Sequence, residues 1–336
     1  MRKLNKIIVI ILLVLGIAYF IPLSYYITEP GTIEQLSVDN DPKSFVKVEN
    51  GYSVDGSYSL VTIFMKSGVN IYDLIYAGFV DYAHVYKQKE ITGDLTNEEY
   101  KAEQMENMMM AKYAAVVTAF NKADMPFTVE YDGVVVRKVT KGGPAASASL
   151  KAADRITKVD GQSLDEEGKL SAIFEEKAVG DTVELEIVRD EKVFTKQLTL
   201  TEIPATGKPG IGIHFTENKN VITAPKVNIN SEKISGPSAG LMFALEIFDQ
   251  LHEKSYAKGH QIAGTGAIDS EGKVGAVGGV DQKVVTAHKE GCDIFFVPAG
   301  ENYEKAAKTG EKIGTKMKIV PVKTFDDAIL YLEELQ

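Results

Sequence analysis

The chain has 336 residues, of which 44% are apolar and 25% charged, as expected for about two globular domains with buried cores. This composition excludes a wholly disordered chain and a collagen-like fibre. A single cysteine, Cys292, excludes an intramolecular disulfide, and we expect no metal ion or cofactor because no Cys/His cluster occurs. The formal net charge of −10 argues against nucleic acid as a partner.

The N-terminal segment is the most apolar part of the chain. Bases stand at positions 2, 3 and 6, and residues 7–27 carry no charge. That length can cross a hydrocarbon layer of about 30 Å, so we expect a cytoplasmic stub (1–6) and a transmembrane helix (7–27). The flanking bases place the rest of the chain outside the cytoplasm, as a single-pass protein of the cell membrane. A cleaved signal peptide is the alternative, but no small-x-small site follows the apolar run.

Residues 28–124 form an N-terminal extracytoplasmic region. Phe45–Val48 and Tyr58–Met65 have strand-like composition, and Asn70 is suited to cap a helix that runs toward Tyr86. A longer helix is expected over Asn97–Lys122. Its apolar stripe consists of Met105, Met109, Tyr113, Val116 and Phe120. The cluster Met108–Met110 fits core packing better than the alternative, an adaptable peptide-binding surface.

From residue 125 to 203 the pattern changes to short strands and turns. Strands are expected at Val134–Val139 and near 183–187, and a short helix at Asp165–Lys177. The segment resembles a bacterial PDZ domain, whose pattern is roughly S-P-A-x-x-A-G-L-x-x-G-D-x-I. The matching residues are Pro144, Ala145, Ala148, Leu150, Asp154 and Ile156. Ser149 and Ala153 replace two glycines of that pattern.

A PDZ fold implies binding of an extended peptide at a sheet edge. By this resemblance, Gly133 and Val134 would present backbone N–H groups to a peptide carboxylate. The alternative is that Gly133 only forms a turn before the strand.

The segment Gly236-Pro237-Ser238-Ala239-Gly240 precedes an apolar helix, Leu241–Phe248. Taken alone, a serine at a helix start is most often an N-cap. Downstream, Gly278 and Gly279 precede a second helix, Asp281–Glu290, which contains Lys283.

Together these two segments resemble the protease domain of the Lon family, which places a Lon-type α/β domain at 208–336. The resemblance implies that Ser238 is the nucleophile and Lys283 its base, with Gly236 and Ala239 as motif residues that shape the oxyanion site. Gly264–Ile268 is similar to a third family segment, in which Thr265 would support the lysine. The sequence therefore predicts an α+β chain with a transmembrane helix, a PDZ domain and a Lon-type protease domain.

The chemistry requires these residue types. A serine hydroxyl is inert at neutral pH without an adjacent base. Lysine serves as that base only when neutral, and burial among apolar groups lowers its pKa. The helix start at Ser238 offers backbone N–H groups to an oxyanion.

The order of the segments is similar to that of membrane-anchored PDZ–Lon proteases of Gram-positive bacteria. No G-x-x-x-x-G-K-[ST] motif occurs, so we expect no ATP and an extended substrate, such as an exported signalling peptide or a membrane-protein tail. The expected partners are peptides or unfolded segments and the membrane, and the resemblance also allows a homo-oligomer.

The competing function is a PDZ adaptor with an inactive protease fold. Because residues 210–336 are short for the protease fold, strands near 45–65 are a hypothesis for completing its sheet, with the PDZ domain inserted.

Overall fold

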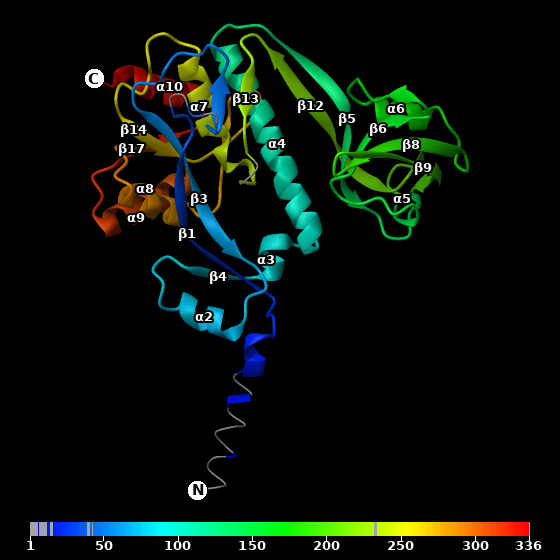
Figure 1. Ribbon diagram of the computed structural model, residues 1–336, viewed down its shortest axis with the longest axis horizontal. Helices are drawn as coiled ribbons and strands as arrows, with labels where there is room; N and C mark the ends of the chain where they lie inside the picture. The colour runs from blue at the N-terminus through cyan, green and yellow to red at the C-terminus, as the bar shows by residue number, and fades with distance from the viewer. Residues whose placement is uncertain are drawn as a thin grey trace.

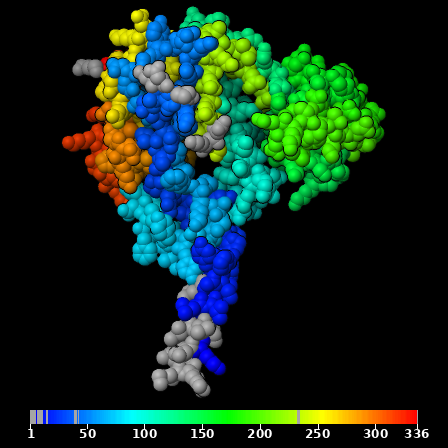
Figure 2. All heavy atoms as spheres, in the orientation of Figure 1, coloured from blue at the N-terminus to red at the C-terminus, as the bar shows by residue number. Residues whose placement is uncertain are grey.

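The computed structural model describes residues 6, 12–13, 16–38, 41, 43–231 and 234–335. These residues form a larger body around one six-stranded sheet and a smaller lobe around another. Figure 1 shows the smaller lobe, in green, projecting to one side of the body, and Figure 2 shows the same division on the surface.

The central sheet of the body combines strands from both ends of the chain, in the order β18-β17-β14-β3-β1-β4. Its strands are β1 (Tyr25–Gln35), β3 (Ser57–Lys66), β4 (His84–Lys87), β14 (Gln261–Gly264), β17 (Ile294–Pro298) and β18 (Lys318–Val322). The C-terminal strands β14, β17 and β18 are parallel, whereas β1 runs antiparallel to both β3 and β4.

The two halves of this sheet meet where β3 pairs with β14. Ser57–Leu60 lie parallel to Gln261–Gly264. This is the pairing required by the hypothesis that strands near 45–65 complete the protease sheet. The body therefore needs residues from before and after the smaller lobe to form its core.

Helices cover both faces of the central sheet. They are α4 (Asn97–Lys122), α7 (Gly240–Gln250) and α10 (Phe325–Glu334) on one face, and α8 (Val280–Lys289) and α9 (Glu301–Ile313) on the other. Successive residues of β3 divide between the two cores, since Leu60 packs with the first set and Val61 with the second. Helix α4 starts with a capping box in which Thr96 Oγ1 accepts from Glu99 N and Glu99 Oε2 accepts from Thr96 N.

The smaller lobe has a hydrophobic core of its own, which includes Val136, Ile156 and Leu185. Its strand order is β12-β5-β6-β8-β9, with β7 paired to β6. The elements are β5 (Phe127–Val139), α5 (Pro144–Ser147), β6 (Arg155–Val159), β7 (Gln162–Ser163), α6 (Lys169–Glu175), β8 (Thr182–Arg189), β9 (Lys192–Thr199), β10 (Thr201–Ile203), β11 (Lys208–Gly210) and β12 (Ile213–Thr223). The long antiparallel pair β5 and β12 carries the chain from the body into this lobe and back (Figure 1).

Short elements complete the body. They are β2 (Val46–Val48), α2 (Ile71–Ala77), α3 (Gln88–Thr92), β13 (Val227–Ile229), the 3-10 turn η1 (Pro237–Ala239), β15 (Ala267–Ile268) and β16 (Val274–Gly275). Strand β2 pairs with β13, and β15 pairs with β16.

The predicted transmembrane helix over 7–27 is wrong. Tyr25, Tyr26 and Ile27 belong to β1, and Tyr26 and Ile27 are buried in the body. Across the ranges that the structure describes, no helix combines the length and the apolar character that a membrane span requires. Much of the predicted span, at 7–11 and 14–15, lies outside the described residues.

Two expectations for the region before residue 125 also need correction. The helix after Asn70 ends at Ala77 instead of running toward Tyr86, because residues 84–87 pair with β1 as β4. Helix α4 has the predicted bounds, but Met105 is exposed while Met108 and Phe120 are buried.

Candidate active site

A cavity of about 860 Å³ opens along the body between β3, α4, η1 and the start of α8. Ser238 and Lys283 both line it, together with Gly236 and Ala239. The structure thus brings together residues that are far apart in the sequence.

Ser238 lies on a tight turn that leads directly into the buried helix α7. Gly236 has a φ of +86°, a backbone conformation that favours glycine. Its N–H donates to Gln104 O in α4 at 3.0 Å. The carbonyl of Ser238 accepts from Gly266 N at 2.9 Å, which fixes the turn from the opposite side.

Lys283 points from α8 toward this turn. Its Nζ lies 2.9 Å from Ser238 Oγ and 2.8 Å from Thr265 Oγ1. The lysine is only 3% exposed. Burial lowers its pKa from the ordinary value to about 7, because a charged ammonium loses its hydration in this setting. A substantial fraction of Lys283 is therefore neutral at neutral pH.

Thr265 orients the amine. It is fully buried, and its Oγ1 donates to Ser238 O at 3.2 Å. Because the hydroxyl hydrogen is used in that bond, Oγ1 accepts a hydrogen from Lys283 Nζ. A neutral amine that donates to Thr265 has its lone pair free to accept the proton of Ser238.

The acid nearest to Lys283 in sequence faces away from it. Asp281 Oδ2 lies 2.7 Å from His84 Nε2, and Asp281 Oδ1 lies 3.0 Å from Lys305 Nζ. These two contacts fasten the edge strand β4 and helix α9 to α8. Within the described ranges, no group of three or more His, Cys, Asp or Glu side chains is placed to hold a metal ion.

The sequence interpretation missed the residues before position 125 that form one wall of the cavity. They include Leu60, Ile63, Phe64, Met65, Tyr100, Gln104 and Met108. Met108 is buried in the core, as the packing interpretation expects, and it also lines the cavity. Of the described lining residues, only Glu34 is acidic and only Lys283 is basic.

One edge of β3 faces this cavity. Strand β14 ends at Gly264, opposite Leu60, so the described residues contain no strand beside Val61–Lys66 on that side. Ser57 N donates to His260 O, toward β14. Along a strand, the N–H groups of every second residue point to the same side. The amides of Ile63 and Met65 therefore point to the side on which Ser57 N meets His260 O. A sheet edge with unpaired groups can pair with an added extended strand.

The predicted PDZ contacts at Gly133 and Val134 are not available in the structure. Gly133 N donates to Leu164 O at 2.9 Å, and Val134 is fully buried between β12 and β6. Strand β5 is therefore interior. The edge strand on this side of the sheet is β12, which the sequence interpretation did not recognise as part of the lobe.

Two family models match the chain. Residues 125–200 match the PDZ domain, and residues 198–333 match the Lon protease (S16) C-terminal proteolytic domain. The chain therefore contains a PDZ domain and a Lon-type proteolytic domain.

Curated Lon proteases are similar to part of the chain. A Lon protease of Aster yellows witches'-broom phytoplasma is 32% identical over 113 residues, which cover 34% of this chain and 14% of that protein. A Lon protease of Mesomycoplasma hyopneumoniae is 30% identical over 139 residues, covering 41% of this chain and 15% of that protein. The match thus spans about a seventh of the length of these relatives. Among solved structures, the PDZ domain of an SdrC-like protein from Listeria monocytogenes is 37% identical, with 26% of this chain and 90% of that chain covered and a TM-score of 0.24.

Proposed function

We propose that the chain is an endopeptidase that uses Ser238 and Lys283 as a catalytic pair and cleaves extended peptide segments without ATP. The observation that supports this function best is the 2.9 Å distance between Ser238 Oγ and the buried Lys283 Nζ. A binding module has no need for a buried lysine with a lowered pKa beside a serine hydroxyl.

The reaction proceeds by acyl transfer. Neutral Lys283 accepts the hydroxyl proton as Ser238 Oγ bonds to the substrate carbonyl carbon. The peptide C–N bond then breaks, and the leaving amine takes the proton from the Lys283 ammonium. In the second half, Lys283 takes a proton from a water molecule as the water oxygen bonds to the ester carbonyl carbon. The bond to Ser238 Oγ then breaks, and the Lys283 ammonium returns the proton to Ser238 Oγ. Backbone N–H groups at the start of α7 are suited to stabilise the oxyanion, although Pro237 has none to offer.

The shape of the cavity favours an extended substrate. A peptide paired with the free edge of β3 at Val61–Lys66 would pass along the wall that faces Ser238. Its side chains would contact mainly apolar groups, such as Leu60, Phe64 and Met108. We therefore assign the substrate class as extended peptides with apolar side chains near the scissile bond. The cellular location and the physiological substrate stay predictions of the sequence.

A cleavage assay tests this function. The full chain is incubated with fluorogenic peptides that carry apolar residues, in the absence of nucleotide. We expect cleavage by the wild-type chain and a loss of at least about a thousandfold in Ser238→Ala and Lys283→Ala. Lys289→Ala is the matched control, because this lysine is exposed near the far end of the same helix.

Two outcomes would reject the proposal. Cleavage that survives both substitutions would show that another group is the nucleophile. Peptide binding without any cleavage by the wild-type chain would instead favour the PDZ adaptor.

A further inference from the structure

An apolar surface lies far from the PDZ lobe, at the end of the body where α2 packs. Ile71, Tyr72, Ile75, Tyr76 and Phe79 all expose more than a third of their surface, and Phe79 is 85% exposed. We call these five residues the α2 patch. Figures 1 and 2 show this part of the chain, in light blue, at the lower end of the body beside the N-terminal segment.

The α2 patch is a fixed part of the fold. Leu74 and Ala77 attach the inner side of the helix to a small core that contains Ile27 and Val69. The chain after the helix is held by successive turns, in which Gly78 N donates to Ile75 O and Phe79 N donates to Tyr76 O. The backbone therefore holds Phe79 outward.

The patch is also electrically neutral. Asp73 is the one charged residue of α2, and it lies 2.6 Å from Lys66 Nζ. The side chain of Lys66 and the amide of Asn70 lower the pKa of Asp73, with the amide as the larger cause. The charge of Asp73 is thus balanced by Lys66.

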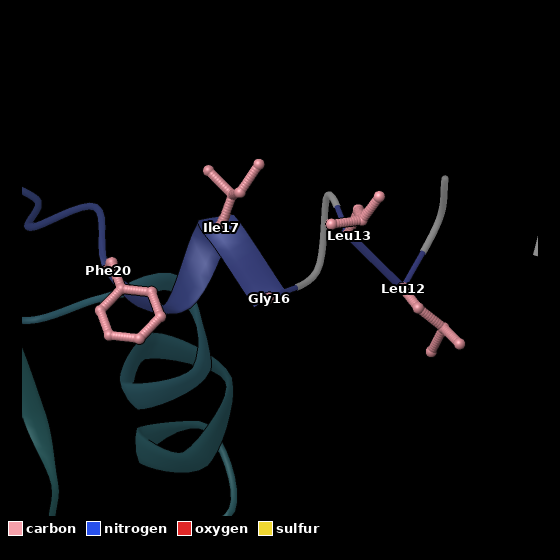
Figure 3. A pocket seen from close by; sticks show the side chains of 5 residues that line it. All are labelled: Leu12, Leu13, Gly16, Ile17 and Phe20. Carbon is pink, nitrogen blue, oxygen red and sulfur yellow. The ribbon is translucent and has the colours of Figure 1, made fainter. Parts of the chain in front are cut away.

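The apolar surface continues into the described part of the N-terminal segment. The ring of Tyr19 packs on Tyr72 with centroids 6.2 Å apart, and Asn70 Nδ2 donates to Tyr19 O. Figure 3 shows Leu12, Leu13, Ile17 and Phe20, which with Gly16 line a hollow of about 390 Å³ on this segment. Phe20 is 81% exposed. Exposed apolar groups therefore extend over both the segment and α2.

We propose that the α2 patch seats in the interfacial layer of a lipid bilayer, in the plane of the membrane. A contiguous patch of this kind marks an interaction surface. Aromatic and aliphatic side chains with tyrosine hydroxyls suit the boundary between headgroups and acyl chains. A protruding, nearly fully exposed Phe79 suits a deformable lipid phase better than a preformed protein pocket. This inference does not depend on the proposed peptidase activity.

The absence of tryptophan from the chain gives a direct test. Phe79→Trp in the full chain introduces a single fluorescent reporter in the patch. We expect its emission to shift to shorter wavelength on addition of phosphatidylcholine vesicles, and to lose more than half of its intensity when the acyl chains are brominated. Val193→Trp is the matched control, since Val193 is an exposed residue of β9 in the PDZ lobe. Its emission is expected to remain unchanged.

Two results would overturn the proposal. The first is a Phe79→Trp spectrum that stays typical of water, without bromolipid quenching, while the chain floats with the vesicles. The second is a shift that appears without lipid and grows with protein concentration, together with a dimer in light scattering, because a second copy would then cover the patch.

Discussion

The burial of Lys283 fits the proposed catalytic role of its amine and has a cost in stability. Its amine has two hydroxyl neighbours, Ser238 and Thr265, and no carboxylate partner among the described contacts. Desolvation is the cause of its lowered pKa. The same desolvation that produces a neutral base penalises the folded state whenever the lysine is protonated.

The rate of peptide cleavage should follow the protonation of Lys283. Because the pKa of Lys283 is about 7, the base is mostly charged below that pH and mostly neutral above it. We expect kcat/KM to rise about tenfold per pH unit below neutrality and to level off above it. Initial rates with a short peptide between about pH 5 and 9 measure this. A flat profile over that range would contradict the assignment of Lys283 as the base.

The free energy of unfolding should also depend on the protonation of Lys283. The pKa of Lys283 is lowered on folding, so the unfolded chain binds more protons between about pH 7 and 10.5 and the folded state gains stability as the pH rises. Lys283→Met removes this dependence and the activity. We expect the variant to be more stable than wild type near pH 7, and its advantage to shrink by about 1.4 kcal/mol per pH unit toward pH 10.

Denaturant unfolding of both proteins at several pH values measures the difference. A constant difference across this range would show that the lysine is not desolvated in the folded state.

Spacing and resemblance predicted the two main site residues, because Ser238 and Lys283 lie in short motifs with local backbone requirements. Gln104 had no such signal, and Met108 stood out only as part of a methionine cluster that was assigned to core packing. They reach the cavity only because α4 packs on α7, and long-range packing leaves no mark on residue spacing. Gly133 failed for a related reason, since a glycine before a strand gives no information on whether the strand is interior or at an edge.

Among the elements, β3 has two roles along its length. Its first half joins β14 to complete the sheet, and its second half offers an open edge to the cavity. The sequence indicated both the strand and its hydrophobic character. The open edge, however, depends on β14 ending at Gly264, which is a property of another part of the chain.

Removing one backbone donor from that edge should weaken substrate binding. Ile63→Pro eliminates an amide that faces the cavity, and proline is tolerated at sheet edges. We expect KM to rise about 2- to 10-fold, as for the loss of one hydrogen bond. Ile63→Ala is the control, because it shortens the side chain but retains the amide. Equal KM values for the two variants, with intact folds by circular dichroism, would exclude strand pairing at this position.

At the scale of the whole molecule, the PDZ lobe is an insertion with its own core, linked by the β5–β12 pair. It also touches the body at α4. Arg137 Nε lies 2.8 Å from Glu106 Oε2, and Thr216 Oγ1 donates to Glu106. Helix α4 thus contacts the lobe on one side and, on the other, lines the cavity that contains Ser238 and Lys283.

The body should fold without the lobe. Tyr131 and Lys219 are paired on adjacent strands, so an Asn-Gly turn can join them in place of residues 132–218. We expect a soluble protein with cooperative unfolding that cleaves a short peptide within a few-fold of the full chain. Glu106 loses its two partners, but its carboxylate becomes hydrated. The same deletion with Ser238→Ala controls for contaminating peptidases, and an unfolded product would contradict the independence of the two cores.

The central sheet combines strands from before and after the PDZ lobe, and this has a consequence for biosynthesis. Val48 N donates to the buried side chain of Gln250, a contact across 202 residues of sequence, and β14 can join β3 only after the PDZ segment has been made. On the ribosome, the PDZ lobe has all its residues before the body does and can fold first. Ser238 and Lys283 meet only once the last third of the chain has emerged. If the proposed function holds, a nascent chain is therefore without peptidase activity until synthesis is nearly complete.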